Sequence, residues 1–324
     1  MEIIYEIKNL KKYFPVKKRK LFEKEKYLKA LDGIDLEIRK GETLGLVGES
    51  GSGKSTLGKC ITGIINSTDG SVFYKGKDIK DKSNKAIMQN EIQAIFQDPY
   101  SSLDPTLTVF EIVAEPIKTR FSYDNKKIRD MVEGLLDKVG LSKDIMEKKP
   151  SQFSGGQRQR ISIARAISTN PEFILCDEPI SALDVSIQAQ IVNLLEDLQK
   201  DLGLTYLFIA HDLAMVEHIS HRIAVLYLGK FVEIGNSEDI YENPSHPYTR
   251  ELLGSVLKPE VNKDKTIITN FNKEIPSPID LPKGCVFQGR CPYKSQRCMQ
   301  EVPTLEELGN GHKSACFYAN ILNK

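Results

Sequence analysis

The sequence lacks a secretory signal and any apolar run long enough to cross a membrane. Its first residues, Met1 to Ile7, contain no basic region followed by an apolar stretch and a small-residue cleavage site. Apolar runs such as Leu207 to Ala210 are short, whereas a helix needs roughly 20 apolar residues to span a bilayer. We therefore expect a chain that stays in the cytoplasm and reaches a membrane only through partners.

The chain also lacks a large net charge of either sign. Lysine plus arginine (45) nearly balances aspartate plus glutamate (44), so no whole-molecule field indicates a nucleic-acid partner. Between Lys8 and Lys29, however, ten basic residues face only Glu23 and Glu25. We favour a solvated basic loop for this stretch over one that binds an anionic membrane surface or partner.

Apolar strand candidates alternate with helical patterns from residue 1 to about 235, which predicts an α/β domain. Three of these strands each lead into polar or glycine-rich residues suited to binding or catalysis. In open α/β sheets ligands bind beyond the carboxyl ends of strands, so these groups are expected to share one site. The strands are Thr43–Val47 before a glycine-rich loop, Phe173–Cys176 before Asp177 and Glu178, and Thr205–Ala210 before His211.

Residues 98–152 are predicted to be mainly helical, and prolines accumulate beyond residue 236. We assign residues 1–240 to the main domain, with a helical subdomain inserted at about 98–165, and residues 241–324 to a loop-rich tail. The apolar positions that recur with helical spacing are Ile128, Met131, Val132, Leu135, Leu136 and Val139.

The glycine-rich loop from Gly48 to Ser55 matches the P-loop pattern between a strand and a helix. Its amides and the helix N-terminus favour phosphate, Lys54 neutralises the β- and γ-phosphates, and Ser55 is expected to ligate Mg²⁺. The expected nucleotide contacts are Gly48, Glu49, Ser50, Gly51, Ser52, Gly53, Lys54, Ser55 and Thr56.

Asp177 and Glu178 follow an apolar strand. Asp177 is placed to hold Mg²⁺ opposite Ser55, directly or through water, and Glu178 to orient or deprotonate the water that attacks the γ-phosphate. An Asp-Glu pair after a strand is more often a turn or a helix cap. The P-loop reverses that preference.

The stretch Phe153 to Gln157 precedes an amphipathic helix and provides a second anion site. Read alone, it is equally well a flexible helix N-cap. Two phosphate-binding devices in one chain indicate two nucleotides, or one nucleotide shared by two subunits. The residues of this second device are Ser154, Gly155, Gly156 and Gln157.

Together these motifs resemble the ABC ATPase family over about 235 residues. Gly48 to Thr56, Gln97, Phe153 to Gln157, Asp177 with Glu178, Ser181 to Asp184, and His211 follow the order of its Walker A, Q-loop, signature, Walker B, D-loop and switch-histidine motifs. Phe153 replaces the more common leucine at the start of the signature.

The resemblance implies a head-to-tail dimer in which each ATP lies between the P-loop of one subunit and the signature of the other. It implies that Gln97 contacts Mg²⁺ and the γ-phosphate, that His211 contacts the γ-phosphate, and that Asp184 reaches across the dimer. A satisfied structural histidine is the alternative for His211. Adenine is expected to stack on Phe14, with Tyr13 and Tyr27 as competitors because the basic stretch blurs the register.

Within the family, the chain is most similar to the F-type subunit of peptide and nickel importers. The stretches that support this are Gln97–Pro105, His246–Leu253 and Gly284–Pro292. This implies a second, related ATPase subunit, two transmembrane permease subunits, an extracytoplasmic solute-binding protein, and a peripheral position on the cytoplasmic face of the membrane.

The same subgroup resemblance implies a Cys₄ iron–sulfur cluster in the tail. The matching residues are Cys285, Cys291, Cys298 and Cys316, whose intervals of five, six and seventeen residues do not resemble the C-x₂-C pairs of zinc ribbons. Four thiolates suit a [4Fe-4S] cluster, with zinc or unligated thiols as alternatives. Cys60 and Cys176 are predicted to be small buried hydrophobic residues.

Three other functions compete with peptide import. Import of nickel or another solute by the same family stays open, because the solute binds to other subunits. A soluble ABC protein that acts on DNA or ribosomes is disfavoured, because the chain has one cassette and no sustained heptads. A catalytically silent cassette is not favoured, since Glu178 and His211 are both present.

Overall fold

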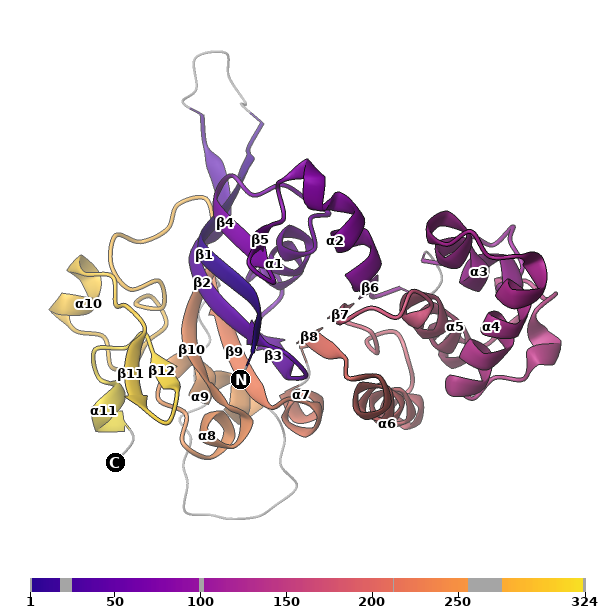
Figure 1. The fold of residues 1–324 in the computed structure, drawn as a ribbon. Helices are drawn as coiled ribbons and strands as arrows, with labels where there is room; N and C mark the ends of the chain where they lie inside the picture. The colour runs from indigo at the N-terminus through magenta and orange to yellow at the C-terminus, as the bar shows by residue number, and fades with distance from the viewer. Residues whose placement is uncertain (1, 18–24, 99–101, 212, 256–275, 323–324) are drawn as a thin grey trace.

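The computed structural model describes residues 2–17, 25–98, 102–211, 213–255 and 276–322. Within them a large mixed sheet and a small antiparallel sheet are packed together, and helices cover both (Figure 1). In spatial order the large sheet contains β11 (Glu306–Gly309), β12 (His312–Ser314), β10 (Lys230–Asn236), β9 (Arg222–Tyr227), β3 (Thr43–Val47), β8 (Thr205–Ile209), β7 (Phe173–Asp177) and β6 (Ile92–Ile95).

The central strands of the large sheet are parallel and almost entirely buried. β3 pairs in parallel with β8 and β9, and β7 pairs in parallel with β6 and β8. Leu46 of β3 and Asp177 of β7 both align with Ile209 of β8, so the carboxyl ends of these strands lie side by side. Strands that are buried on both faces have continuous apolar sequences, and the sequence shows this pattern here.

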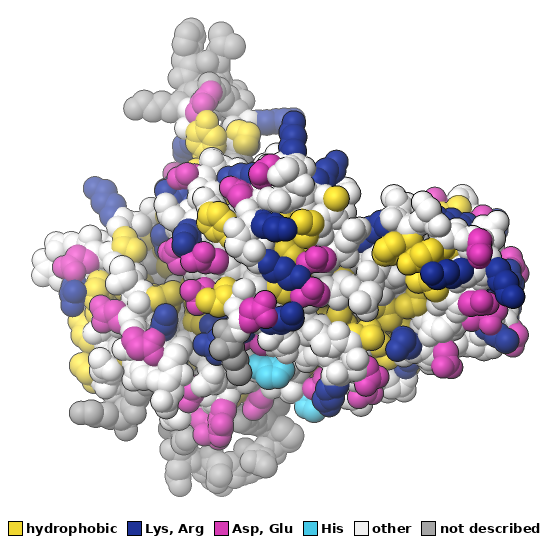
Figure 2. Space-filling model, in the orientation of Figure 1, with side chains coloured by type: hydrophobic (Ala, Val, Ile, Leu, Met, Phe, Trp, Pro, Cys, Tyr) yellow, Lys and Arg dark blue, Asp and Glu magenta, His cyan; other side chains and the backbone are white. Residues whose placement is uncertain are grey.

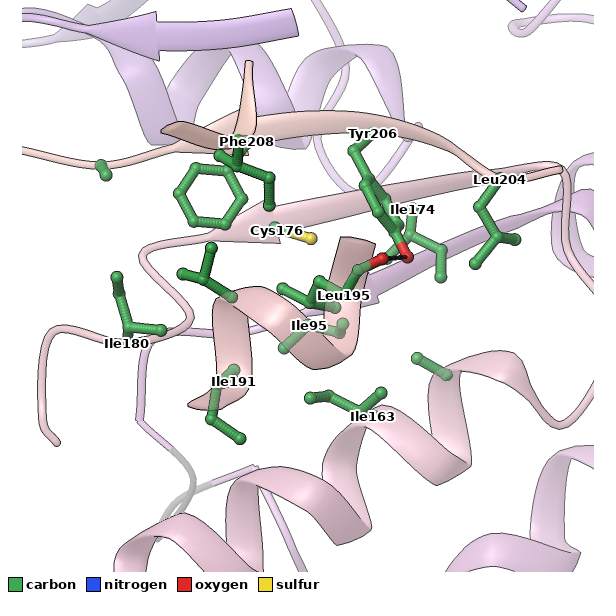
Figure 3. Close-up of a cluster of buried hydrophobic side chains, with 14 of the residues drawn as sticks. Ile95, Ile163, Ile174, Cys176, Ile180, Ile191, Leu195, Leu204, Tyr206 and Phe208 are labelled. Carbon is green, nitrogen blue, oxygen red and sulfur yellow. Dashed lines mark hydrogen bonds between the residues drawn. The ribbon is translucent and has the colours of Figure 1, made fainter. Parts of the chain in front are cut away.

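Successive side chains of the central strands supply two different cores. In β8, Tyr206 and Phe208 enter one core, while Leu207 and Ile209 enter the other, because side chains alternate across a sheet. Figure 3 shows the first core, where the Tyr206 hydroxyl donates a 3.0 Å hydrogen bond to the Leu195 carbonyl. Each fully buried large apolar side chain of this kind stabilises the fold by roughly 1.5–3 kcal/mol.

The second core lies between the large sheet and the small sheet. The small sheet is antiparallel and contains, in spatial order, β2 (Tyr27–Arg39), β1 (Ile3–Pro15), β4 (Asp69–Tyr74) and β5 (Lys77–Asp78). Its strands β1 and β2 are long, and several register shifts bend them around the core. The sequence predicted strands in this region but not a separate sheet.

Three helices form a group at one end of the molecule (Figure 1): α3 (Val109–Arg120), α4 (Asn125–Lys138) and α5 (Gly155–Ile167). Each begins at a polar cap: Thr108 and Ser154 form capping boxes, and the Asp124 carboxylate accepts from the Lys127 amide. In α4, Ile128, Val132 and Leu136 are buried, as their helical spacing predicts.

The remaining helices cover the sheets and the tail. None of the helices in the described part of the chain is both long enough and apolar enough to cross a membrane. These remaining helices, other than α3, α4 and α5, are α1 (Lys54–Ile61), α2 (Lys85–Glu91), α6 (Val185–Leu202), α7 (Leu213–Ile219), α8 (Ser237–Glu242), α9 (Pro247–Ser255), α10 (Gln296–Gln300) and α11 (Ala319–Leu322). Short 3₁₀ turns lie at Lys82–Asn84, Lys143–Ile145 and Pro150–Gln152.

The tail lies at the opposite end of the molecule from the α3–α5 helices (Figure 1). Its hairpin β11–β12 extends the large sheet, because Glu233 and Ile234 of β10 pair with Ser314 and Lys313 of β12. The buried side chains of Tyr248 and Phe287 belong to the same core as the central strands. The tail is therefore packed into the main body of the protein.

Candidate nucleotide site

The P-loop joins β3 to α1 and requires glycine at two positions for steric reasons. A Cβ atom at Gly48 would lie 2.2 Å from the Leu226 carbonyl oxygen, and one at Gly53 would lie 2.3 Å from the Ala30 carbonyl oxygen. Both glycines also adopt positive φ values, 150° and 111°. The loop is thus pressed against the neighbouring backbone at the carbonyls of Leu226 and Ala30.

Lys54 begins α1, and its ammonium group is held inside the loop. Its Nζ donates to the carbonyl oxygens of Gly48 at 2.7 Å and Glu49 at 3.0 Å. Burial lowers the pKa of Lys54, and the negative charges of Glu178, Asp177 and Glu49 oppose that shift. A cation therefore sits where the pattern predicts that phosphate binds.

Ser55 and Asp177 meet although they lie 122 residues apart in the chain. The Ser55 hydroxyl donates to Asp177 Oδ1 at 2.8 Å, and Asp177 is buried at the end of β7. Two oxygen ligands at this distance from one another fit a magnesium ion, which prefers oxygen donors.

Glu178 contacts two other residues that the sequence assigned to this site. Its Oε2 accepts a 2.8 Å hydrogen bond from Gln97 Nε2 and lies 3.7 Å from His211 Nδ1. Its amide donates to the Ile209 carbonyl at 3.0 Å, and its φ of 50° lies in the left-handed region, which is rare for a non-glycine residue. The turn after β7 thus projects the carboxylate toward Gln97 and His211.

The signature residues lie on a different part of the chain from the P-loop. Ser154 caps α5, its Oγ accepting from the Gln157 amide, and α5 packs on α3, α4, α6 and β6, whereas α1 packs on β2, β7 and β8. Gly155 begins the helix, and a Cβ at Gly156 would lie 2.6 Å from Ile187 of α6. Asp184 stands at the exposed start of α6, beside Val185, which is 76% exposed.

The candidates for adenine stacking are distinguished by their contacts. The Tyr13 hydroxyl donates to Asp32, and the Tyr13 amide donates to Thr68 Oγ1 at 2.9 Å. Phe14 is 38% exposed and pairs with Leu28 of β2, two residues from Ala30, which touches the P-loop. Tyr27 is also exposed, at the start of β2 opposite Pro15.

A cleft of about 870 Å³ lies beside the site, between the α1–α2–β6 region and the helices α3 and α5. Gln97 and Asp177 line it together with Glu115 of α3 and Arg165 of α5. On the face drawn in Figure 2, basic and acidic side chains are interspersed, so no single-sign field covers that face.

The four tail cysteines lie in one region. The Cys285 amide donates to the Cys298 carbonyl at 2.8 Å, and the Tyr318 amide contacts the Cys316 sulfur at 3.4 Å. Burial is the main cause that raises the thiol pKa of Cys285 to about 11 and of Cys291 to about 12; backbone hydrogen bonds oppose the rise, and the neighbouring cysteines add to it.

These thiols do not form a metal-binding set in the structure. Across the ranges that it describes, no group of three or more His, Cys, Asp or Glu side chains is arranged to hold a metal ion. The predicted metal site in the tail is therefore not supported by this geometry. Cys60 and Cys176 are buried, as predicted, and burial raises the thiol pKa of both.

Two contacts of the P-loop were missed by the sequence analysis. Tyr248 of α9 and Arg290, both in the tail, contact Glu49. The only available signal was that both lie in the stretches His246–Leu253 and Gly284–Pro292, which carried the subgroup resemblance.

Comparisons with known proteins identify two families that match this chain. Residues 31–181 match the family described as ABC transporter, and residues 232–298 match the family described as oligopeptide/dipeptide transporter, C-terminal region. The oligopeptide transport ATP-binding protein AppF of Bacillus subtilis is 46% identical over 323 residues, which cover 97% of this chain and 97% of that protein.

The oligopeptide transport ATP-binding protein OppF of Escherichia coli is 48% identical over 313 residues, covering 94% of this chain and 93% of that protein. Among solved structures, a dimeric post-hydrolysis state of the ATP-binding cassette MJ0796, bound to ADP and Pi, is similar with a TM-score of 0.63. It is 31% identical and covers 72% of this chain and 98% of that chain.

Proposed function

This chain belongs to the ABC transporter family, and we propose that it is the ATP-binding and ATP-hydrolysing subunit of an importer for di- or oligopeptides. One observation carries the proposal: a P-loop, a Ser55–Asp177 pair and a Glu178–Gln97 pair converge in a chain similar to oligopeptide transport ATP-binding proteins over nearly its whole length.

In this proposal the P-loop binds the triphosphate. The loop amides and the N-terminus of α1 hold phosphate oxygens, and Lys54 exchanges its two carbonyl partners for the β- and γ-phosphates. Ser55, Asp177 and Gln97 would hold Mg²⁺, which when bound neutralises charge on the β- and γ-phosphates. Phe14 stacks on adenine, because it is exposed and pairs with Leu28, two residues from Ala30 at the P-loop. The Tyr13 hydroxyl, in contrast, is committed to Asp32, and Tyr27 lies one pair farther along, opposite Pro15.

Glu178 is proposed to activate the attacking water. Its carboxylate lies between Gln97 and His211, so a water bound there can lose a proton to Glu178 while His211 contacts the γ-phosphate. Phosphoryl transfer needs positioning and charge stabilisation more than covalent chemistry, and these residues supply both.

A complete site is proposed to need a second cassette. The signature residues of this chain lie away from its own P-loop, and the similar MJ0796 cassette is described as dimeric. Ser154, Gly155, Gly156 and Gln157 then contact the γ-phosphate bound by the other subunit, and Asp184 with the exposed Val185 meets that subunit.

We propose a related, distinct ATPase as the second cassette, with a second copy of this chain as the alternative. The other proposed partners are two transmembrane permeases and an extracytoplasmic solute-binding protein. The cleft beside Gln97 is where a permease would be coupled to the site, since it is bounded by the nucleotide-contacting segment and by the helices α3 and α5. This assembly would hold the chain on the cytoplasmic face of the membrane.

For the tail we propose a [4Fe-4S] cluster on Cys285, Cys291, Cys298 and Cys316, with zinc as the alternative. The grouping of four thiols supports this, but the sulfurs as they stand do not form a ligand set and would have to draw together. We therefore derive no step of the mechanism from a metal. Iron, sulfide and zinc analysis of anaerobically purified protein distinguishes the two occupants.

Uptake into proteoliposomes tests the transport function. The chain is combined with its partner ATPase, both permeases and the solute-binding protein, and ATP-dependent uptake of a radiolabelled dipeptide, a radiolabelled oligopeptide or nickel is measured. Peptide uptake that stops when Glu178 is replaced by glutamine supports the proposal. Nickel uptake with no peptide uptake refutes peptide as the substrate.

A further inference from the structure

Arg290, in the cysteine-rich tail, binds the side chain of a P-loop residue. Its Nη1 and Nη2 atoms donate to the two carboxylate oxygens of Glu49 at 2.7 and 2.9 Å, in a bidentate pair between residues 241 positions apart. Nη2 also donates to the Glu251 carboxylate of α9. Paired, parallel hydrogen bonds of this kind fix orientation as well as distance.

This contact is enclosed by the protein. The Arg290 side chain is 5% exposed, and its guanidinium carbon lies 5.6–5.9 Å from the ring centres of Tyr227, Tyr248 and Phe287. A buried cation needs partners, because an unpaired charge in an apolar environment is strongly destabilising. The aromatic rings therefore keep Arg290 directed at Glu49 and Glu251.

The backbone of Glu49 is held as well. Its amide donates a 2.8 Å hydrogen bond to the Tyr248 hydroxyl, and its carbonyl accepts from Lys54 Nζ at 3.0 Å. A continuous path thus runs from Arg290 and Tyr248 through Glu49 to the lysine at the phosphate site. Arg290 directly precedes Cys291, so the path begins inside the cysteine-rich segment.

We propose that Arg290 is a positioning residue for nucleotide binding: through Glu49, the C-terminal tail holds the P-loop in the shape that accepts phosphate. This inference rests on the proposed binding of ATP at the P-loop. It does not depend on whether the cysteines hold a metal. The tail then acts on the nucleotide site through Glu49.

Arg290→Gln tests the proposal, and Arg297→Gln is its matched control. Arg297 precedes Cys298 as Arg290 precedes Cys291, but its ion pair, with Glu301 at 2.9 Å, stays within the tail. In the full-length chain, Arg290→Gln should raise the Kd for Mg-ATP about tenfold, the change that corresponds to one charge-assisted hydrogen bond. In the assembled transporter, KM should rise while kcat changes little, because Glu178 and Gln97 are untouched.

A double-mutant cycle with Glu49→Gln separates positioning from simple stabilisation. The double variant should bind Mg-ATP no more weakly than either single variant, because both changes remove the same contact. Arg290→Lys keeps the charge without the bidentate geometry and should give an intermediate Kd. If Arg290→Gln fails to fold, Arg290→Lys and Glu49→Gln carry the test.

The measurements also separate this inference from the proposed function. If wild type and Arg297→Gln do not bind Mg-ATP, the proposed function fails. If they bind and the Arg290 variants keep the wild-type Kd despite a lower unfolding temperature, Arg290 is merely structural and the inference is overturned. Additive effects in the cycle overturn it too.

Discussion

Replacing Glu178 by glutamine isolates the role of one carboxylate in hydrolysis. The substitution keeps the size of the side chain and a carbonyl oxygen that can accept from Gln97, which lies 2.8 Å from Oε2. It removes the charge and the proton acceptor that face His211 at 3.7 Å. The proposed phosphate contacts of Lys54 and Ser55 are not changed, so the variant should lose ATP hydrolysis while keeping its affinity for ATP.

The size of the loss follows from the role that is removed. A positioned general base accelerates the reaction by about 10²- to 10⁴-fold, so its loss should raise the activation free energy by about 3–5 kcal/mol. The Kd for Mg-ATP should stay at the wild-type value, because binding and proton abstraction involve different side chains. With ATP bound and hydrolysis blocked, the paired cassettes should also remain closed.

Phosphate release by the assembled transporter measures the turnover, and equilibrium binding to the full-length chain measures the Kd. Glu196→Gln is the matched control, since Glu196 of α6 also lies beside a histidine, 3.8 Å from His218 Nε2. The control should keep wild-type turnover. Wild-type turnover in Glu178→Gln would show that another group activates the water.

Three further substitutions test the other parts of the site. Lys54→Ala should raise the Kd for ATP by about 10- to 150-fold, since it removes a cation from the phosphates; an unchanged Kd in a binding titration would contradict this. Ser154→Arg should lower turnover of the assembled pair yet leave ATP binding to the chain's own P-loop intact, and loss of that binding would argue against a shared site. With a [4Fe-4S] cluster, anaerobically purified wild-type protein should be brown and contain iron. Cys298→Ser should remove the colour and the iron, whereas Cys60→Ser should keep both. Stoichiometric zinc in the wild type would exclude the cluster.

The strands that carry the P-loop and the acidic pair could be predicted because they are short, buried and apolar. The predicted strand Thr43–Val47 coincides with β3, and the predicted Phe173–Cys176 differs from β7 only by Asp177. Polar residues end these runs where the strands leave the core, so the position of the site follows from local pattern.

Elements defined by distant contacts could not be predicted in the same way. β11 (Glu306–Gly309) contains two adjacent glutamates and no apolar alternation, and it is a strand because β12 pairs with it and with β10. The Arg290–Glu49 contact joins residues 241 positions apart, and neither residue carries a local signal for the other. Tertiary context decides both.

The packing of the tail also connects the edge of the large sheet to the P-loop by a series of contacts. The Glu233 carboxylate of β10 is fully buried and accepts from the amides of Ser245 and His246 at 2.6 and 3.0 Å, while its Oε1 lies 2.8 Å from His312 Nε2 of β12. One side chain thus fixes the hairpin of the tail and the start of α9. The first turns of α9 carry Tyr248, whose hydroxyl accepts from the Glu49 amide. Because an unpaired buried carboxylate or amide is costly, these contacts should form or break together, and a change at the hairpin would reach the P-loop through α9.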